Sequence, residues 1–182
     1  MKLLIASDIH GSAYYCEELL KAFESENADR LLLLGDILYH GPRNDLPKEY
    51  SPKTVIELLN RIKERIFCIR GNCDTEVDQM VLDFPILADY CILPVKDKIL
   101  YASHGHKYNP ENPPPLSDGD ILLNGHTHIP MHAEYEKFIY INPGSVSIPK
   151  NSSPHSYIIL QGDIFSWKNL ETFNEYDRLC IR

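Results

Sequence analysis

The sequence predicts an α/β fold in which two mixed sheets pack together and helices lie outside them. The first half of the chain alternates apolar strands with amphipathic helices, whereas the second half holds mostly short apolar strands separated by turns. This division favours two packed sheets with flanking helices. The chain is long enough to bury a sizeable core, and we expect a single domain over residues 1–182.

The first elements form a β-α-β unit. Residues 2–7 are expected to form a buried strand, and Ser12 is placed to cap a helix that runs to about Glu24. Apolar residues of that segment recur on one helical face: Cys16, Leu19, Leu20 and Phe23. The four leucines of 31–34 suit a strand buried on both faces. The unit therefore predicts a parallel strand pair with a right-handed crossover.

A loop and a second helix follow. Glycine and proline interrupt residues 37–51, so this segment is expected to be a loop. Ser51 and Pro52 are typical residues for the start of a helix. The third strand is expected at 66–69, and a short helix at 74–82.

The second half of the chain is expected to be mostly strand. The expected strands are 84–93, 98–102, 121–123, 131–136, 138–141, 156–161 and 164–167. The first two suit an antiparallel pair in a second sheet. Several prolines fall in 107–118, so this segment is expected to be a loop.

Composition excludes several classes of protein. The 43% hydrophobic and 24% charged content is that of a soluble globular protein, and no apolar run approaches a membrane span. The N-terminal apolar stretch is too short for a secretory signal, so we expect a cytoplasmic protein. Five scattered cysteines argue against a disulfide framework or a zinc knuckle. A net charge of -8 argues against a nonspecific nucleic-acid surface, although it does not exclude a phosphate substrate.

Potential metal ligands follow the apolar runs. Five runs end at a carboxylate, amide or imidazole side chain: Asp8, Asp36, Asn72, His104 and His126. Two more imidazoles, His10 and His128, follow two residues after Asp8 and His126. Because ligands of open α/β sheets bind outside the carboxyl ends of strands, these side chains are placed to meet at one site.

Each of these residues also has an ordinary structural interpretation. Gly-Asp is common in turns, and an isolated histidine is more often a surface residue than a ligand. Their recurrence at successive strand ends is hard to explain by turns alone. Mixed carboxylate, imidazole and amide donors suit Mn, Fe or Zn better than Ca or Mg. Seven donors are too many for one tetrahedral ion, and they fit two ions that share a carboxylate, as in phosphoryl-transfer sites.

The motifs carry a resemblance to a known family. Together, Asp8-x-His10, Gly35-Asp36, Gly71-Asn72, Ser103-His104-Gly105 and Gly125-His126-Thr127-His128 resemble the motif set of the calcineurin-like metallophosphoesterases. Further similarity to the compact YfcE-type phosphodiesterases lies in Gly35–Arg43, Gly71–Asp74 and Asn142–Ser145. The resemblance implies a four-layer α/β/β/α sandwich. It implies one metal held by Asp8, His10, Asp36 and His128, and another held by Asp36, Asn72, His104 and His126.

The resemblance also implies an activity. We expect hydrolysis of a small phosphodiester or nucleotide-type substrate by attack of a metal-bridging hydroxide, with Asn72, His10 and Cys73 as catalytic residues. Two Mn²⁺ ions are the expected cofactors, with Zn²⁺, Fe or Ni²⁺ as alternatives. Neither a nucleic-acid polymer nor a membrane is expected as a partner, and the resemblance suggests a homo-oligomer, either a dimer or a tetramer.

Cys73 departs from the pattern of many relatives, which carry histidine after Gly-Asn. A thiol donates weakly, and nearby cations would favour thiolate, so Cys73 is a poor proton donor to a leaving group. We therefore expect a preference for diesters or good leaving groups over alkyl monoesters. An equally good interpretation of Cys73 is that it is a small side chain packed in the interior.

Two other functions stay open: a phosphomonoesterase of the same fold, and a scaffold that has lost catalysis. Arg43 and His106 are weaker candidates for the pocket.

Overall fold

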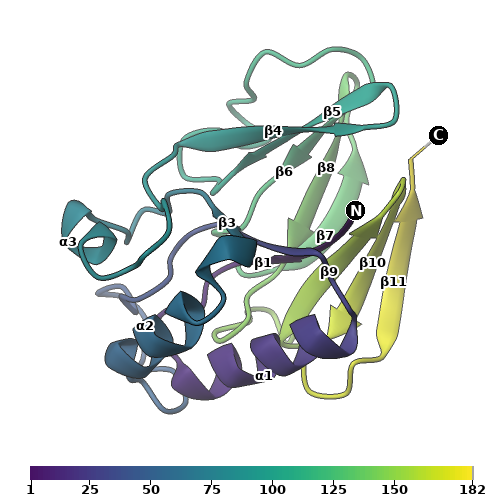
Figure 1. Cartoon of the computed structure of the whole chain (residues 1–182). Coiled ribbons are helices and arrows are strands. Elements are labelled where there is room, and N and C mark those ends of the chain that lie inside the picture. The colour runs from purple at the N-terminus through teal and green to yellow at the C-terminus, as the bar shows by residue number, and fades with distance from the viewer. Residues whose placement is uncertain (182) are drawn as a thin grey trace.

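A computed structural model describes residues 1–181 and contains two sheets (Figure 1). The six strands of the first sheet have the order β11 (Glu175–Cys180), β10 (Ile164–Asn169), β9 (Ser156–Gln161), β1 (Lys2–Ala6), β2 (Arg30–Leu33), β3 (Ile66–Cys68). The five strands of the second have the order β4 (Tyr90–Val95), β5 (Lys98–Ser103), β6 (Asp120–Leu123), β8 (Phe138–Pro143), β7 (Pro130–Glu134). Each sheet combines parallel and antiparallel pairs, which confirms the predicted mixed sheets.

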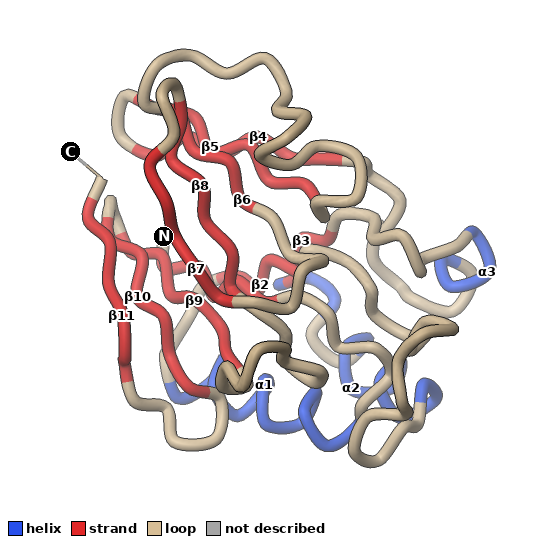
Figure 2. Tube along the Cα trace, turned by 180° about the vertical axis from the view of Figure 1, so that it is seen from behind, coloured by secondary structure: helices blue, strands red, loops and turns tan. Residues whose placement is uncertain are grey.

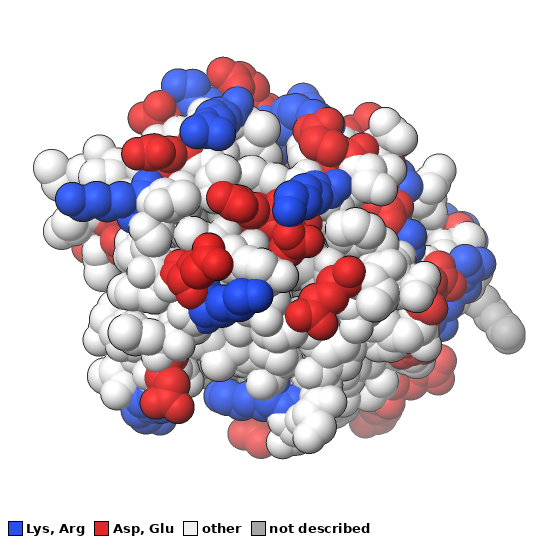
Figure 3. Space-filling model, turned by 90° about the horizontal axis from the view of Figure 1, so that it is seen from below, with Lys and Arg blue, Asp and Glu red and all other residues white. Residues whose placement is uncertain are grey.

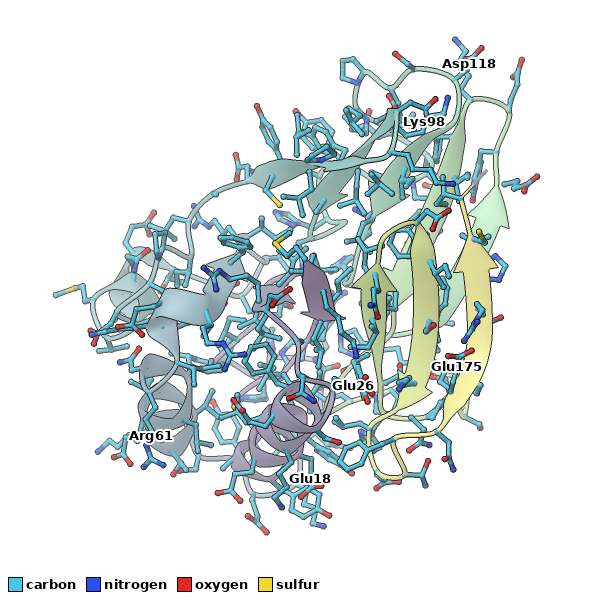
Figure 4. The ribbon with its side chains drawn as sticks, turned by 45° about the vertical axis from the view of Figure 1, so that its right-hand side comes forward. Glu18, Glu26, Arg61, Lys98, Asp118 and Glu175 are labelled. Carbon is cyan, nitrogen blue, oxygen red and sulfur yellow. The ribbon has the colours of Figure 1, made fainter. Side chains whose placement is uncertain are left out.

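Helices cover one face of the first sheet (Figures 1 and 2). Helix α1 (Ala13–Ser25) and helix α2 (Pro52–Asn60) pack through apolar side chains against β1 and β2. A 3₁₀ turn, η1 (Lys63–Arg65), precedes β3, and the short α3 (Glu76–Gln79) follows it. Figure 4 shows Glu26, which follows α1 and forms ion pairs with Lys2 at 2.9 Å and Lys168 at 2.5 Å. These pairs connect the end of α1 to the first sheet.

The four leucines of 31–34 are buried on both sides of the first sheet, as predicted. Leu31 and Leu33 face the helices, whereas Leu32 and Leu34 face the second sheet. Successive side chains of a strand point to opposite faces, so an unbroken apolar run is what a doubly covered strand requires. The inter-sheet core also contains Leu3 and Ile5 from β1.

A loop, rather than a helix, covers the outer face of the second sheet. Four buried side chains lie on that face: Tyr101, Leu122, Phe138 and Tyr140. Tyr108 and Leu116, from the connection between β5 and β6, pack on them. Four prolines in this connection remove backbone donors and fix φ, which opposes helix formation. The fourth layer of the predicted sandwich is therefore a proline-rich loop.

Two further differences from the expected elements concern strands. The strand expected at 84–93 begins only at Tyr90, because 84–88 runs as irregular chain whose Phe84 and Ile86 are buried. Strand β11 was not predicted, since its charged sequence lacks apolar alternation. It occupies the edge of the first sheet, where one side of the strand faces solvent.

The molecular surface carries mixed charge on the side seen in Figure 3, where acidic and basic side chains alternate without a single-sign patch. Within residues 1–181, no helix has the length and apolar character needed to cross a membrane.

The cap of α1 generates a stability prediction. The Ser12 hydroxyl accepts a hydrogen bond from the Tyr15 N–H at 3.3 Å and donates to the Lys48 carbonyl at 2.6 Å. Ser12→Ala removes both bonds and should lower the free energy of unfolding by about 1–2 kcal/mol in a urea titration. Ser25→Ala, at the exposed end of the same helix, is the matched control. Equal stability of the two variants would contradict this role of Ser12.

Candidate metal centre

Three predicted ligands follow the parallel strands of the first sheet. Asp8, Asp36 and Asn72 come after β1, β2 and β3, whose carboxyl ends lie at the same edge. The chain stays paired beyond the strands, because the His10 N–H donates to the Asp36 carbonyl at 2.9 Å. Asp8 and Asp36 are therefore held side by side at the rim of the sheet, with 0% and 2% exposure.

The second sheet supplies the other three imidazoles. His104 follows β5, while His126 and His128 follow β6. The His126 N–H donates to Asp8 Oδ2 at 3.0 Å, and His104 Nδ1 lies 2.6 Å from the Leu34 carbonyl oxygen. The structure thus brings all seven predicted ligands to one rim formed by both sheets.

The backbone at this rim is unusual. Five of the predicted ligands have left-handed φ values between 49° and 64°: Asp8, His10, Asp36, His126 and His128. Each such residue costs about 1–3 kcal/mol, and such residues cluster at functional sites. Gly71 permits a close approach, since a Cβ there would lie 2.1 Å from Asp36 Oδ1. The local conformation therefore aims side chains inward at an energetic cost.

Three histidine rings are held in place by a hydrogen bond at Nδ1, which leaves Nε2 free. Their Nδ1 atoms face backbone carbonyls: His10 faces Tyr39 at 2.7 Å, His104 faces Leu34 at 2.6 Å, and His128 faces Ile148 at 2.6 Å. A carbonyl only accepts hydrogen bonds, so Nδ1 carries the proton and donates. In the neutral ring, Nε2 then presents a lone pair to the site. This is the usual support of a metal-bound histidine.

The first donor cluster contains Asp8, His10 and His128. Asp8 Oδ1 lies 3.5 Å from His10 Nε2 and 3.3 Å from His128 Nε2, and the two Nε2 atoms are 3.3 Å apart. Ligands at ~2.1 Å from one ion in tetrahedral geometry are separated by about 3.4 Å. The described residues provide no hydrogen-bond donor to the buried Asp8 Oδ1. An orphaned carboxylate oxygen between two imidazole nitrogens fits a cation.

The second donor cluster contains Asn72, His104 and His126. His104 Nε2 lies 3.0 Å from Asn72 Oδ1 and 3.2 Å from His126 Nδ1. Asp36 Oδ2 connects the clusters, at 3.4 Å from His104 Nε2 and 3.6 Å from His10 Nε2. A single carboxylate oxygen thus faces both groups, which fits two cations with one shared ligand.

The charges of these groups are strongly coupled. Burial alone would raise the pKa of Asp8, but His10 and His128 beside it hold that pKa well below its usual range. Burial alone would lower the pKa of His104, but Asp36 and Asp8 raise it to about 9. The protein groups on their own therefore favour carboxylates paired with a protonated imidazole. Because a metal ligand must be deprotonated, a cation binding here would compete with that proton.

Cys73 lies beside the shared carboxylate. Its N–H donates to Asp36 Oδ1 at 2.8 Å, and the Asn72 amide lies 3.3 Å from its Sγ. Burial raises the pKa of the Cys73 thiol, and the charge of Asp36 raises it further. The surrounding protein groups therefore keep this side chain as a thiol, whereas cations would favour the thiolate.

A pocket of about 360 Å³ opens over the donors. Arg43, a weaker candidate from the sequence, lines it, and Lys150 lines it as well. Lys150 was missed because nothing in its neighbourhood predicts proximity to the site. His106 is half-buried beside His104, and burial, followed by the charge of His104, lowers its pKa to about 4.

Asp74 was also missed, although it organises the rim. Its buried carboxylate accepts hydrogen bonds from the N–H groups of Asp36 at 2.8 Å, Ile37 at 2.9 Å and Gly71 at 2.7 Å. It therefore holds the loops after β2 and β3 together. Its place in Gly71–Asp74 gave no sign that its carboxylate accepts hydrogen bonds from the backbone after the neighbouring strand β2 instead of binding a ligand.

Replacing this carboxylate generates a prediction. Asp74→Asn turns one acceptor oxygen into a donor, so at least one buried backbone N–H loses its partner. The free energy of unfolding should fall by about 1–3 kcal/mol, measured in urea. Asp83→Asn is the control, because Asp83 forms a surface pair with Lys63 and should change stability by less than about 0.5 kcal/mol. Identical midpoints for both variants would refute the organising role of Asp74.

Comparison with known proteins identifies the family to which this chain belongs. The model of the calcineurin-like phosphoesterase superfamily domain matches residues 1–164. The chain is 47% identical over 166 residues to phosphodiesterase YfcE of Escherichia coli K12, covering 91% of this chain and 90% of that protein. A probable metallophosphoesterase of Bacillus subtilis, YsnB, is 25% identical over 167 residues, covering 88% and 83% of the two chains.

Comparison with solved structures gives a matching result. The structure of YfcE, described as a phosphoesterase from E. coli, matches with a TM-score of 0.96 and 44% identity over 100% of both chains. Vacuolar protein sorting 29 from Cryptosporidium parvum matches with a TM-score of 0.63 at 16% identity, covering 98% and 97% of the chains, and shares the fold alone. On the extent of these matches, the chain belongs to the calcineurin-like phosphoesterase superfamily.

Proposed function

We propose that the protein is a metal-dependent phosphodiesterase acting on a small phosphodiester or nucleotide-type substrate. The observation that carries this proposal is the position of Asp36 Oδ2, which faces His10 on one side and His104 on the other. Two ions that share a carboxylate suit in-line displacement at phosphorus. The name of the relative that is 47% identical, a phosphodiesterase, supports the choice of a diester.

The proposed metal ligands divide into two sets. One set is Asp8, His10, Asp36 and His128, and the other is Asp36, Asn72, His104 and His126. Two divalent cations, for which we propose Mn²⁺, would supply Lewis-acid stabilisation of the phosphoryl group and activation of water. The donor chemistry, which mixes carboxylate, amide and imidazole, supports such a metal.

The side chains of this chain have separate tasks. Buried Asp36 and His10 form the floor of the pocket. Asn72 is exposed at the pocket, where its Nδ2 is available to donate to a phosphate oxygen while its Oδ1 faces His104. His10 has Nδ1 bonded to the Tyr39 carbonyl, so binding through Nε2 leaves it no free nitrogen. We therefore propose His10 as a ligand rather than a proton carrier.

The two alternative functions would require different chemistry of this site. A phosphomonoesterase would need a proton for an alkoxide leaving group, and the Cys73 thiol is a weak donor for that task. A scaffold would not need the seven donors to converge at an energetic cost in the backbone. We further propose one domain over residues 1–182, a cytoplasmic location and self-association.

Removal of the shared carboxylate tests the metal assignment. Asp36→Asn should reduce bound Mn²⁺ from two ions per chain to nearly none and abolish hydrolysis of bis(4-nitrophenyl) phosphate, because both sets lose a ligand. Metal content is measured after dialysis by mass spectrometry, beside initial rates. Asp118→Asn is the control, since Asp118 lies in the loop outside the second sheet (Figure 4). Retention of two ions by Asp36→Asn would disprove the shared-ligand assignment.

Substitution of the thiol tests substrate preference. Cys73→His should raise the kcat for alkyl phosphate monoesters relative to the diester by about tenfold or more, because imidazole protonates an alkoxide leaving group better than a thiol. Cys73→Ser controls for loss of the sulfur without adding a base. An unchanged ratio of monoester to diester rates in Cys73→His would show that Cys73 does not set this preference.

A further inference from the structure

Two cationic side chains stand at the mouth of the pocket. Arg43 and Lys150 are both exposed, whereas Asp36 and His10 at the floor have 2% and 1% exposure. We infer that Arg43 and Lys150 bind a second anionic group on the substrate, separate from the reacting phosphate. This inference rests on the proposed phosphodiesterase function and specifies its substrate class: a diester with one ester arm that carries a phosphate or carboxylate.

Neither cation has a partner within residues 1–181. Among the described residues, ten other basic side chains of this acidic protein pair with carboxylates, as Lys96 does with Asp163 and Lys107 does with Asp89. The described part of the chain offers the side chains of Arg43 and Lys150 no ion pair and no hydrogen bond. Among the described residues, Asp36 at the floor is the only carboxylate that lines the pocket. The charges of Arg43 and Lys150 are therefore available to a ligand.

The segment that carries Lys150 is anchored to the metal centre. The Lys150 N–H donates to the His128 carbonyl at 3.1 Å, and the Ser153 hydroxyl donates to the Lys150 carbonyl at 2.7 Å. In the other direction, His128 Nδ1 donates to Ile148 at 2.6 Å. The backbone of Lys150 is thus fixed relative to one proposed ligand, which limits the conformational cost of binding through this side chain.

The loop of Arg43 lies on the other side, beside Cys73. The Asn44 amide donates to the His40 carbonyl at 2.8 Å and closes a turn around Arg43. A Cβ placed on Gly41 would lie 3.6 Å from Cys73 Sγ, so this turn packs against the thiol. The two cations therefore approach the pocket from separate loops.

This placement favours an anion on an ester arm. The reacting phosphate must lie near the donors at the floor, whereas the exposed ends of Arg43 and Lys150 are at the solvent side. A guanidinium presents a planar fork that suits phosphate or carboxylate, and a lysine adds a point charge. In a protein of net charge -8, a local pair of cations also counters repulsion of a doubly charged substrate.

The test compares two chromogenic diesters with one leaving group. The first is the 4-nitrophenyl ester of thymidine 5′-phosphate, and the second is the same ester with a 3′-phosphate. Release of 4-nitrophenolate gives kcat/KM for both in the wild type, Arg43→Gln and Lys150→Gln. Lys53→Gln is the matched control, because Lys53 lies on α2 and also has no ion pair among the described residues.

We expect the wild type and Lys53→Gln to prefer the 3′-phosphorylated diester, and each pocket variant to lower that preference by about three- to tenfold, through KM. A second pair of diesters, with a carboxylate or a neutral amide on the arm, distinguishes the two anions. Equal kcat/KM for both thymidine esters in the wild type, or an equal loss for both in the variants, would overturn the inference while leaving diester hydrolysis intact. Absence of diester hydrolysis in the metal-loaded wild type would instead overturn the proposed function.

Discussion

The orientation of one carboxylate, that of Asp36, determines how the rim of this protein is built. Its Oδ1 accepts the Cys73 N–H, its Oδ2 faces two imidazoles, and its own N–H donates to Asp74. Gly71 allows the approach, because any side chain there would occupy the position of Oδ1. The contacts of Asp36 thus connect the ends of β2 and β3 to histidines from both sheets.

The core supplies the rigidity that this arrangement needs. Five left-handed residues at the rim cost several kcal/mol in total. That cost is tolerable because β1 and β2 are buried on both faces and cannot easily relax. Hydrogen bonds add local support: the hydroxyls of Ser145 and Ser147 both donate to the Asp8 carbonyl, at 2.9 and 3.0 Å. The strained segment is therefore held from two sides.

Much of this organisation could be predicted from the sequence, for identifiable reasons. A strand that is buried on both faces, such as 31–34, is recognisable from its unbroken apolar run. The potential metal ligands at the strand ends are recognisable from their residue types. Strand β11 could not be predicted, because an edge strand needs no apolar alternation. Asp74 and Lys150 could not be placed either. Their roles depend on tertiary contacts, to backbone N–H groups in one case and to a pocket mouth in the other.

The boundary between the two sheets passes through the candidate metal centre. His104 reaches from the second sheet to the Leu34 carbonyl of the first, and the His126 N–H reaches Asp8. An ion bound by ligands from both sheets would therefore act as a cross-link between them. Metal binding would then be coupled to the stability of the interface between the sheets. Depletion of the cation should destabilise the contacts between the sheets near the rim before those between the distant strands.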